Sequence, residues 1–320
     1  MTRSLDPILS PRCLMALSFL LVTEMILPPE IHPEIVQYLW DDKKALKACS
    51  TASSTFTASA QRHLFSQIII RGPLKPTKVQ DIGGSPQNFK NLLDQSPHIA
   101  SYVDYLELFD DVRFASRSGL EPTTREEWLP TDTFLASCLN RLFNLKALVI
   151  QYGNREDFDQ TRWEEIRRWN EIPDALLSSI LALLHQPSLV YVDMKSAPIN
   201  FILPGIGPNI RHVVVYDLLK DTRLYSAPSQ PLPGLPELTS LFINYGVDME
   251  DAMELFVNEP SRSFDITKLE RLIIWVEGYD YITQHDLVAE FLESCSGTIK
   301  EFYFSPCLEG ELSVALSPRT

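Results

Sequence analysis

The sequence LKALVI, residues 145–150, carries the pattern that decides the fold, with apolar side chains at its first, fourth and sixth positions. One other residue stands between its last two apolar positions, so both point to the same face, as in a strand that buries one face. The pattern starts again along the chain at Val103, Leu145, Leu189, Ile210, Leu238, Leu269 and Ile299, and a further copy starts at Phe65. This recurrence predicts a series of similar strands.

Apolar residues at helical spacing lie between these hexads, as in residues 134–142, 176–184 and 287–292. A strand and a crossover that alternate at a recurring interval are typical of a solenoid. We therefore expect an α/β fold in which residues 99–320 form an irregular solenoid of parallel strands with helical crossovers. The alternative is an ordinary α/β domain with a parallel sheet, which alternates in the same way.

The composition excludes several classes of function. A formal net charge of −14 argues against nucleic acid or an anionic membrane as a partner, because both require clustered Lys and Arg. The five cysteines are scattered, without a Cys-x-x-Cys pair or a histidine at ligand spacing, so we expect no disulfide framework, metal site or cofactor. Phosphate-binding, zinc-protease and nucleophile-elbow motifs are missing, so we do not expect an enzyme.

The first 26 residues contain an apolar run from Cys13 to Val22 that follows Arg3 and Arg12. This run has the length of the apolar region of a signal peptide, which would make the protein secreted. However, the residues after it supply no small-residue cleavage site, and no Asn-x-Ser/Thr sequon occurs. We expect residues 1–26 to be a leader or an N-terminal helix, and the protein to be cytoplasmic or nuclear.

Residues 27–70 predict three short helices. Pro33 fits the first turn of the first helix, where no amide partner is lost. Asp41-Asp42 can cap the second helix, and Phe56 and Leu64 lie on the third. Residues 71–98 follow and contain glycine and proline breakers, so we expect them to form a linker.

Three ordered segments carry a resemblance to a known family: Leu27-Pro28-Pro29-Glu30-Ile31, then Asp41-Asp42-x-x-Ala45-Leu46-x-Ala48-Cys49, then Arg62-His63-Leu64-Phe65. Together they resemble the F-box module, particularly that of F-box-like proteins of mushroom-forming fungi. The later hexads look like the irregular leucine-rich-repeat region that follows in such proteins. Their starts are 42, 44, 21, 28, 31 and 30 residues apart (103 to 145, 189, 210, 238, 269 and 299), whereas regular leucine-rich repeats take about 20–29 residues.

The resemblance implies a substrate-recognition adaptor of a ubiquitin ligase. The N-terminal helices would dock on a Skp-family adaptor of a cullin complex, and the solenoid would bind a protein substrate of unknown identity. Carried over residue by residue, the adaptor-facing set is Leu27, Pro28, Ile31, Ile35, Leu39, Leu46 and Cys49. The alternatives are that these residues pack on the first strand of the solenoid, or that the chain is a repeat-type protein-binding scaffold without a ligase link.

Trp128, Trp163 and Trp169 are the candidates for substrate recognition. All three lie in insertions after hexads, where a solenoid presents its binding loops, and tryptophan is enriched at interaction hot spots. The alternative for Trp163 and Trp169 is that they attach a charged helix to the body of the protein.

Overall fold

The computed structural model describes residues 31–71, 84–110, 128–152, 169, 171–195, 197, 206–216, 235–243, 252–253, 256–258, 264–277 and 281–307. The chain divides into two compact units, Met1–Gln67 and Ile68–Thr320. The boundary lies three residues before the expected end of the helical module at residue 70. The expected leader, residues 1–26, lies outside the described residues.

The first unit contains three described helices: α2 (Ile31–Gln37), α3 (Lys43–Ala52) and α4 (Ser54–Phe65). The carboxylate of Asp42 begins α3 by accepting hydrogen bonds from the amides of Lys44 and Ala45 at 3.1 and 2.9 Å, as the sequence predicts. Ser53 begins α4 in a similar way, with its hydroxyl accepting from the amide of Thr55. The three helices enclose a core formed by Val36, Leu39, Ala45, Leu46, Cys49, Phe56 and Ala60.

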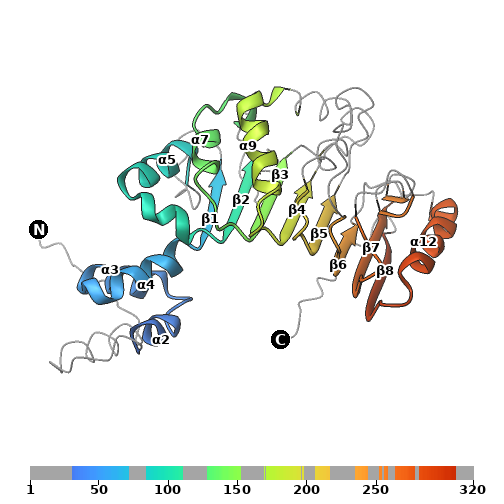
Figure 1. Ribbon diagram of the computed structural model, residues 1–320, viewed down its shortest axis with the longest axis horizontal. Coiled ribbons are helices and arrows are strands. Elements are labelled where there is room, and N and C mark those ends of the chain that lie inside the picture. The colour runs from blue at the N-terminus through green and yellow to red at the C-terminus, as the bar shows by residue number, and fades with distance from the viewer. Residues whose placement is uncertain are drawn as a thin grey trace, which may run out of the picture. The chain divides into compact units, whose positions relative to one another are not determined.

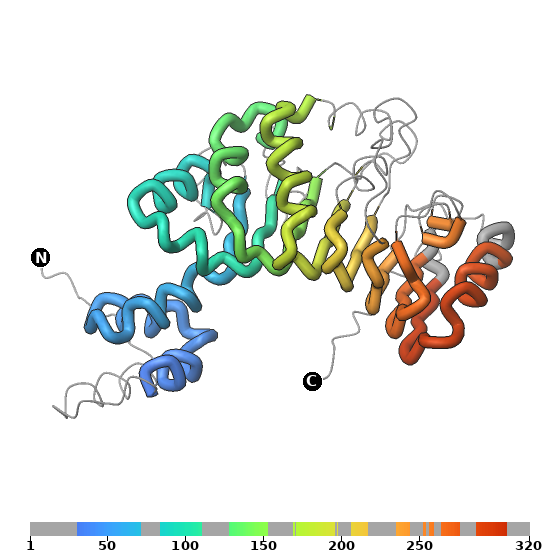
Figure 2. Tube along the Cα trace, in the orientation of Figure 1, coloured from blue at the N-terminus to red at the C-terminus, as the bar shows by residue number. Residues whose placement is uncertain are grey.

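The second unit is built on one sheet of eight strands, whose neighbours follow the order of the chain (Figures 1 and 2). These strands are β1 (Gln67–Arg71), β2 (Tyr105–Asp110), β3 (Ala147–Tyr152), β4 (Tyr191–Lys195), β5 (His212–Tyr216), β6 (Ser240–Ile243), β7 (Arg271–Glu277) and β8 (Glu301–Cys307). Every pairing from β2 to β8 is parallel. A doubly wound sheet would reverse its strand order, so the sheet is solenoid-like, and the expected α/β class is confirmed.

The register aligns the predicted hexads. The fourth hexad positions pair across the sheet in one row: Leu106, Leu148, Val192, Val213, Leu241, Leu272 and Phe302. The sixth positions form a second row, and in both rows the residues from β2 to β7 are almost completely buried. Because alternate residues of a strand point to opposite faces, both rows lie on the face that packs into the core.

A backbone hydrogen-bond motif repeats at the start of each strand. The carbonyl oxygen of the second hexad residue accepts the amides of the second and third residues of the next hexad. For Lys146 the two donors are Val190 and Tyr191, at 2.9 and 3.0 Å. The motif recurs at Asp104, Val190, Arg211, Thr239 and Glu270. The hexads are therefore equivalent structural units although the residues between them vary in number.

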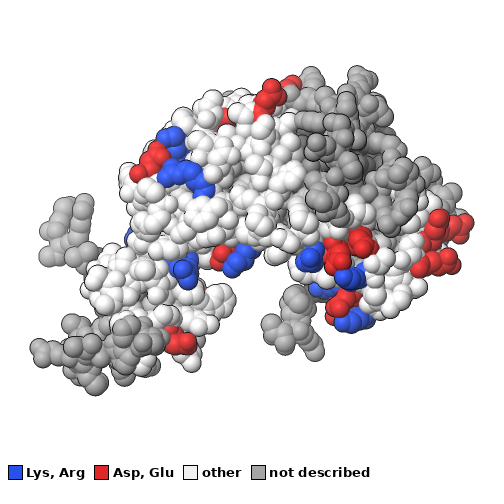
Figure 3. Space-filling view, in the orientation of Figure 1, with Lys and Arg blue, Asp and Glu red and all other residues white. Residues whose placement is uncertain are grey.

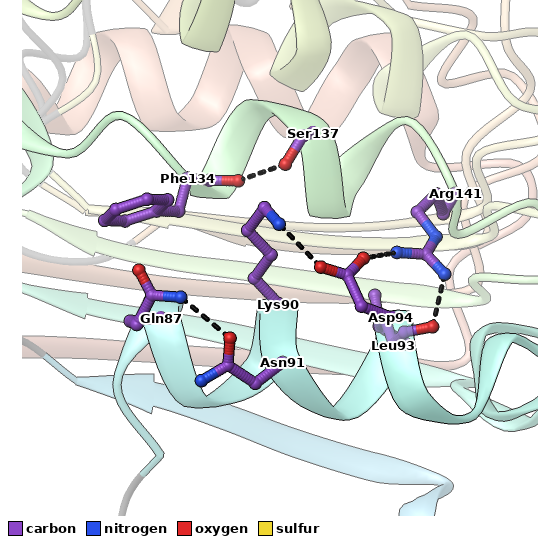
Figure 4. Close-up of polar contacts among 8 residues, drawn as sticks. All are labelled: Gln87, Lys90, Asn91, Leu93, Asp94, Phe134, Ser137 and Arg141. Carbon is purple, nitrogen blue, oxygen red and sulfur yellow. Dashed lines mark hydrogen bonds and ion pairs between the residues drawn. The ribbon is translucent and has the colours of Figure 1, made fainter.

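The described crossovers contain α5 (Pro86–Gln95), α7 (Leu135–Leu139), α9 (Asp174–Leu184) and α12 (Tyr281–Cys295), together with the 3-10 turns η1 (Pro97–Tyr102) and η2 (Leu129–Thr131). Neighbouring helices α5, α7 and α9 pack side by side. Between α5 and the end of α7, Asp94 binds Lys90 and Arg141, and Arg141 also donates to the carbonyl oxygen of Leu93 (Figure 4).

The prediction of a linker over residues 71–98 was wrong for its second half. Helix α5 begins with Pro86 in its first turn and is capped by Ser85, whose hydroxyl accepts from the amide of Asn88 at 3.2 Å. Phe89 and Leu93 are buried on one face of the helix. The glycine and proline residues at 72–86 predict a loop, whereas residues from Pro86 onward form a short amphipathic helix of the second unit.

Candidate functional site

Two surfaces of the described residues stand out, one in each unit. The surface in the second unit is the face of the sheet opposite the hexad core. This face carries the third and fifth residues of each hexad, which the register also aligns into rows. In the first unit it is a set of exposed apolar side chains on and after α2.

On the sheet, two tyrosine–carboxylate pairs lie on either side of β3. The hydroxyl of Tyr105 donates to Oε2 of Glu107 at 3.2 Å on β2, and the hydroxyl of Tyr191 donates to Oδ2 of Asp193 at 3.4 Å on β4. We call these four residues the tyrosine–carboxylate cluster. All four are partly buried.

Small side chains separate the two pairs. Ala147 lies between the tyrosines and Val149 between the carboxylates, in the same register. Because the pairs are two strand spacings apart, their backbones are separated by about 10 Å. Val149 is only 3% exposed, so the position between the two acids is covered.

Burial dominates the ionisation of this cluster. It raises the pKa of Asp193 to about 6, and the negative charge of Glu107 adds to the rise, while the Tyr191 hydroxyl opposes it. Burial, followed by the charge of Glu107, raises the pKa of Tyr105 to about 12. The second carboxylate oxygen of Asp193, Oδ1, is buried and accepts no hydrogen bond from any described residue. Partly desolvated carboxylates with raised pKa values cluster at functional sites.

An aromatic row continues from the cluster across the later strands. The ring centroid of Phe242 lies 5.7 Å from that of Tyr216 and 5.2 Å from that of Trp275, both in edge-on geometry. Trp275 is 41% exposed. The face of the sheet therefore presents acidic groups over β2–β4 and aromatic rings over β5–β7.

The apolar surface of the first unit follows from the helical spacing of α2. Ile31, Ile35 and Tyr38 share one face, because they lie four and then three residues apart. Ile31 is 41% exposed and Tyr38 is 81% exposed, while Ile35 is half-buried against the core. Trp40, just after the helix, is 67% exposed. We call Ile31, Ile35, Tyr38 and Trp40 the α2 patch.

The structure corrects part of the predicted adaptor-facing set. Leu39, Leu46 and Cys49 are at most 6% exposed and form the core of the first unit, so they do not offer surface to a partner. Ile31 and Ile35 belong to the α2 patch. Leu27 and Pro28 lie outside the described residues. Sequence reasoning missed Tyr38 and Trp40, although the spacing of Tyr38 from Ile31 is a helical signal.

The prediction that Trp128 and Trp169 present their rings to a substrate is also corrected. Trp128 is 4% exposed, and its indole Nε1–H donates to the carbonyl oxygen of Phe109 at 3.0 Å. Trp169 is 3% exposed, and its ring packs edge-on against Tyr152 at a centroid distance of 5.4 Å. Trp169 is therefore a packing residue, which is the alternative given for it above. Trp163 lies outside the described residues.

Sequence reasoning also missed the tyrosine–carboxylate cluster, for which a signal exists. The hexads at Val103 and Leu189 both carry tyrosine at their third position and an acid at their fifth. These third and fifth positions face away from the hexad core, so the apolar pattern does not include them.

Other chemistry is absent from the described part of the chain. No group of three or more His, Cys, Asp or Glu side chains there could hold a metal ion. Among the described helices, none has the length and apolar character needed to cross a membrane. Cys49, Cys138 and Cys295 are buried, and burial raises the pKa of the Cys138 and Cys295 thiols to about 11.

Comparison with known proteins adds no identification. No family model matches the chain, and no curated protein matches its sequence.

Proposed function

We propose that this protein is a substrate-recognition adaptor of a Skp–cullin–F-box type ubiquitin ligase. In this proposal the helical unit docks on a Skp-family adaptor, and the sheet unit binds a protein substrate. The resemblance of residues 27–65 to the F-box module motivates the first part. The solenoid-like sheet with irregular crossovers motivates the second, because such sheets bind proteins on an extended face.

The α2 patch is the observation that carries the proposal. Tyr38 and Trp40 are large aromatic side chains that are more than two-thirds exposed, at 81% and 67%. Large apolar side chains that are exposed close together in the sequence of a small helical unit are typical of protein-binding surfaces. The docking mode would be a helix in a groove, with Ile31 on α2 and Tyr38 directly after it as anchors.

A second candidate is a repeat-type protein-binding scaffold without a ligase link. The burial of Leu39, Leu46 and Cys49 favours it, because the helical unit closes a core of its own without a partner. In this case the α2 patch would have no affinity for a Skp-family adaptor.

Mixing the purified full chain with a Skp-family adaptor distinguishes the two candidates. If the proposal holds, size-exclusion chromatography at micromolar concentrations will recover both proteins in one complex. Separate elution at these concentrations would rule out adaptor docking and leave the scaffold candidate.

A further inference from the structure

Strand β8 ends the sheet, and among the described strands it pairs with β7 alone (Figure 1). We propose that β8 pairs antiparallel with β8 of a second copy of this chain across a two-fold axis, which joins the two sheets into one. The inference goes beyond the proposed function. It concerns the sheet unit only, and it needs neither a Skp-family adaptor nor the α2 patch.

The exposure of β8 shows that this end of the sheet is open. In the row of fourth hexad positions, the residues from β2 to β7 are at most 2% exposed, whereas Phe302 on β8 is 40% exposed. Tyr303, on the opposite face of the strand, is 54% exposed. The terminal repeat of a solenoid normally presents a polar outer surface, which these two aromatic side chains do not provide. The side chains of β8 are therefore those of an interior strand that has a neighbour on both sides.

The main chain of β8 supplies hydrogen-bonding groups for such a neighbour. The amide of Glu301 donates to the carbonyl oxygen of Glu270 at 3.0 Å, so Glu301 faces β7. Because successive residues of a strand direct their main-chain groups to opposite edges, those of Phe302 face away from β7. Pro306 faces the same way but has no N–H, which limits pairing to the first part of the strand. A two-fold axis at Phe302 pairs its N–H and C=O with those of Phe302 in the second copy.

The other edge of the sheet indicates why β8 would pair with itself. At β1, the amide of Arg71 donates to the carbonyl oxygen of Gly84 at 3.1 Å, and the amide of Gly84 donates to that of Ile69 at 3.2 Å. These bonds occupy the outer edge of β1, so β8 of one copy does not find an open β1 edge on the next copy. Pairing of β8 with β8 uses the open edge of both copies and closes after two chains.

The local charge allows this pairing although the chain has a net charge of −14. Oε2 of Glu301 lies 3.1 Å from Nε of Arg271, and Oε1 of Glu270 lies 2.7 Å from Nζ of Lys300. Charges of both signs alternate along the edge where the strands begin (Figure 3). Each of these acids therefore has its own cation. The two-fold axis also sets Glu301 of each copy opposite Tyr303 of the other, a carboxylate beside a phenol rather than beside a second acid.

Sedimentation velocity of the full chain measures the association. Two paired strands bury a small interface, so we expect wild type to dimerise with a dissociation constant on the order of 10 µM. Phe302→Asp puts a charge at the axis and should weaken dimerisation by at least about tenfold. Phe143→Asp and Trp40→Asp are the controls, because they place the same charge at aromatic positions outside β8 that are 61% and 67% exposed. Each control should change the dissociation constant by less than about twofold.

A wild type that stays monomeric up to about 100 µM would overturn the proposal, because this edge would then have no affinity for a second copy. A dimer that Phe302→Asp leaves intact, or that either control weakens equally, would also overturn it. Because no Skp-family adaptor is present, these outcomes are independent of adaptor docking.

Hydrogen exchange of wild type replaces Phe302→Asp if circular dichroism shows that this variant is unfolded. Exchange of the Phe302 amide should slow by about threefold or more between about 1 and 100 µM protein, because pairing protects this N–H. The amides of β5, an interior strand, should exchange at the same rate at both concentrations. Exchange of the Phe302 amide that does not depend on concentration would contradict the pairing.

Discussion

The main-chain N–H of Trp128 donates a hydrogen bond to Oδ2 of Asp110 at 3.1 Å, across eighteen residues of chain. The amide of Leu129 donates to the same oxygen at 3.0 Å, and Asp110 is only 5% exposed. The end of β2 thereby fixes the start of η2, and the buried carboxylate is matched by two donors.

Replacing Asp110 with alanine should lower the free energy of unfolding by about 2–4 kcal/mol, because two buried amides lose a charged acceptor. Urea denaturation measures the loss. Asp132→Ala is the control, since Asp132 also accepts two amides, from Phe134 and Leu135, but in a more exposed turn. That variant should cost about 1 kcal/mol. A cost for Asp110→Ala no greater than this would contradict the assigned role.

Gly207 provides a second test of packing in the sheet unit. Its amide donates to the carbonyl oxygen of Leu184 at 2.8 Å, and a Cβ atom at this position would lie 2.9 Å from that same oxygen. Gly207→Ala should therefore destabilise the protein by about 1–3 kcal/mol through forced backbone movement. Gly297→Ala, where no atom lies within 4 Å of the added Cβ, should leave thermal unfolding almost unchanged. Similar melting temperatures for both variants would exclude this close approach.

Asp193 should reduce the stability of the free protein at neutral pH. Its folded-state pKa is raised from 3.8 to about 6, so the folded state binds more protons than the unfolded state between these values. Stability should therefore fall as the pH rises through this window. Asp193→Asn should stabilise the protein at pH 7.5 by roughly 2 kcal/mol, with the gain disappearing below about pH 4. A gain that is the same at both pH values, or a loss at pH 7.5, would contradict the burial of an uncompensated charge.

The order and register of the strands could be predicted from the sequence because the hexad specifies which residues face the core. A strand that slipped by one residue would expose Leu148 and Ile150, so the pattern leaves little freedom of register. The crossovers could not be predicted equally well. Helix α5 is only ten residues long and follows a glycine- and proline-rich segment, so local breakers hid it.

The candidate surfaces were harder to predict, because burial decides them and burial is a tertiary property. Leu46 and Cys49 have the apolar spacing of a binding stripe, yet three short helices need those same residues for their own core. Trp128 lies in an insertion typical of a binding loop, but its indole N–H finds a backbone acceptor inside the unit. The sequence alone does not show whether the stripe that contains Leu46 and Cys49 or the α2 patch is covered in the folded unit.

The most direct test of adaptor docking is a calorimetric titration of the full chain with a purified Skp-family adaptor, comparing wild type with Trp40→Asp and Phe143→Asp. Both aromatic side chains are largely exposed, at 67% and 61%, but Trp40 belongs to the α2 patch and Phe143 lies in the sheet unit. We predict micromolar or tighter binding by wild type and Phe143→Asp, and at least about tenfold weaker binding by Trp40→Asp. Absence of wild-type binding, or equal weakening by both substitutions, would contradict the proposed docking surface.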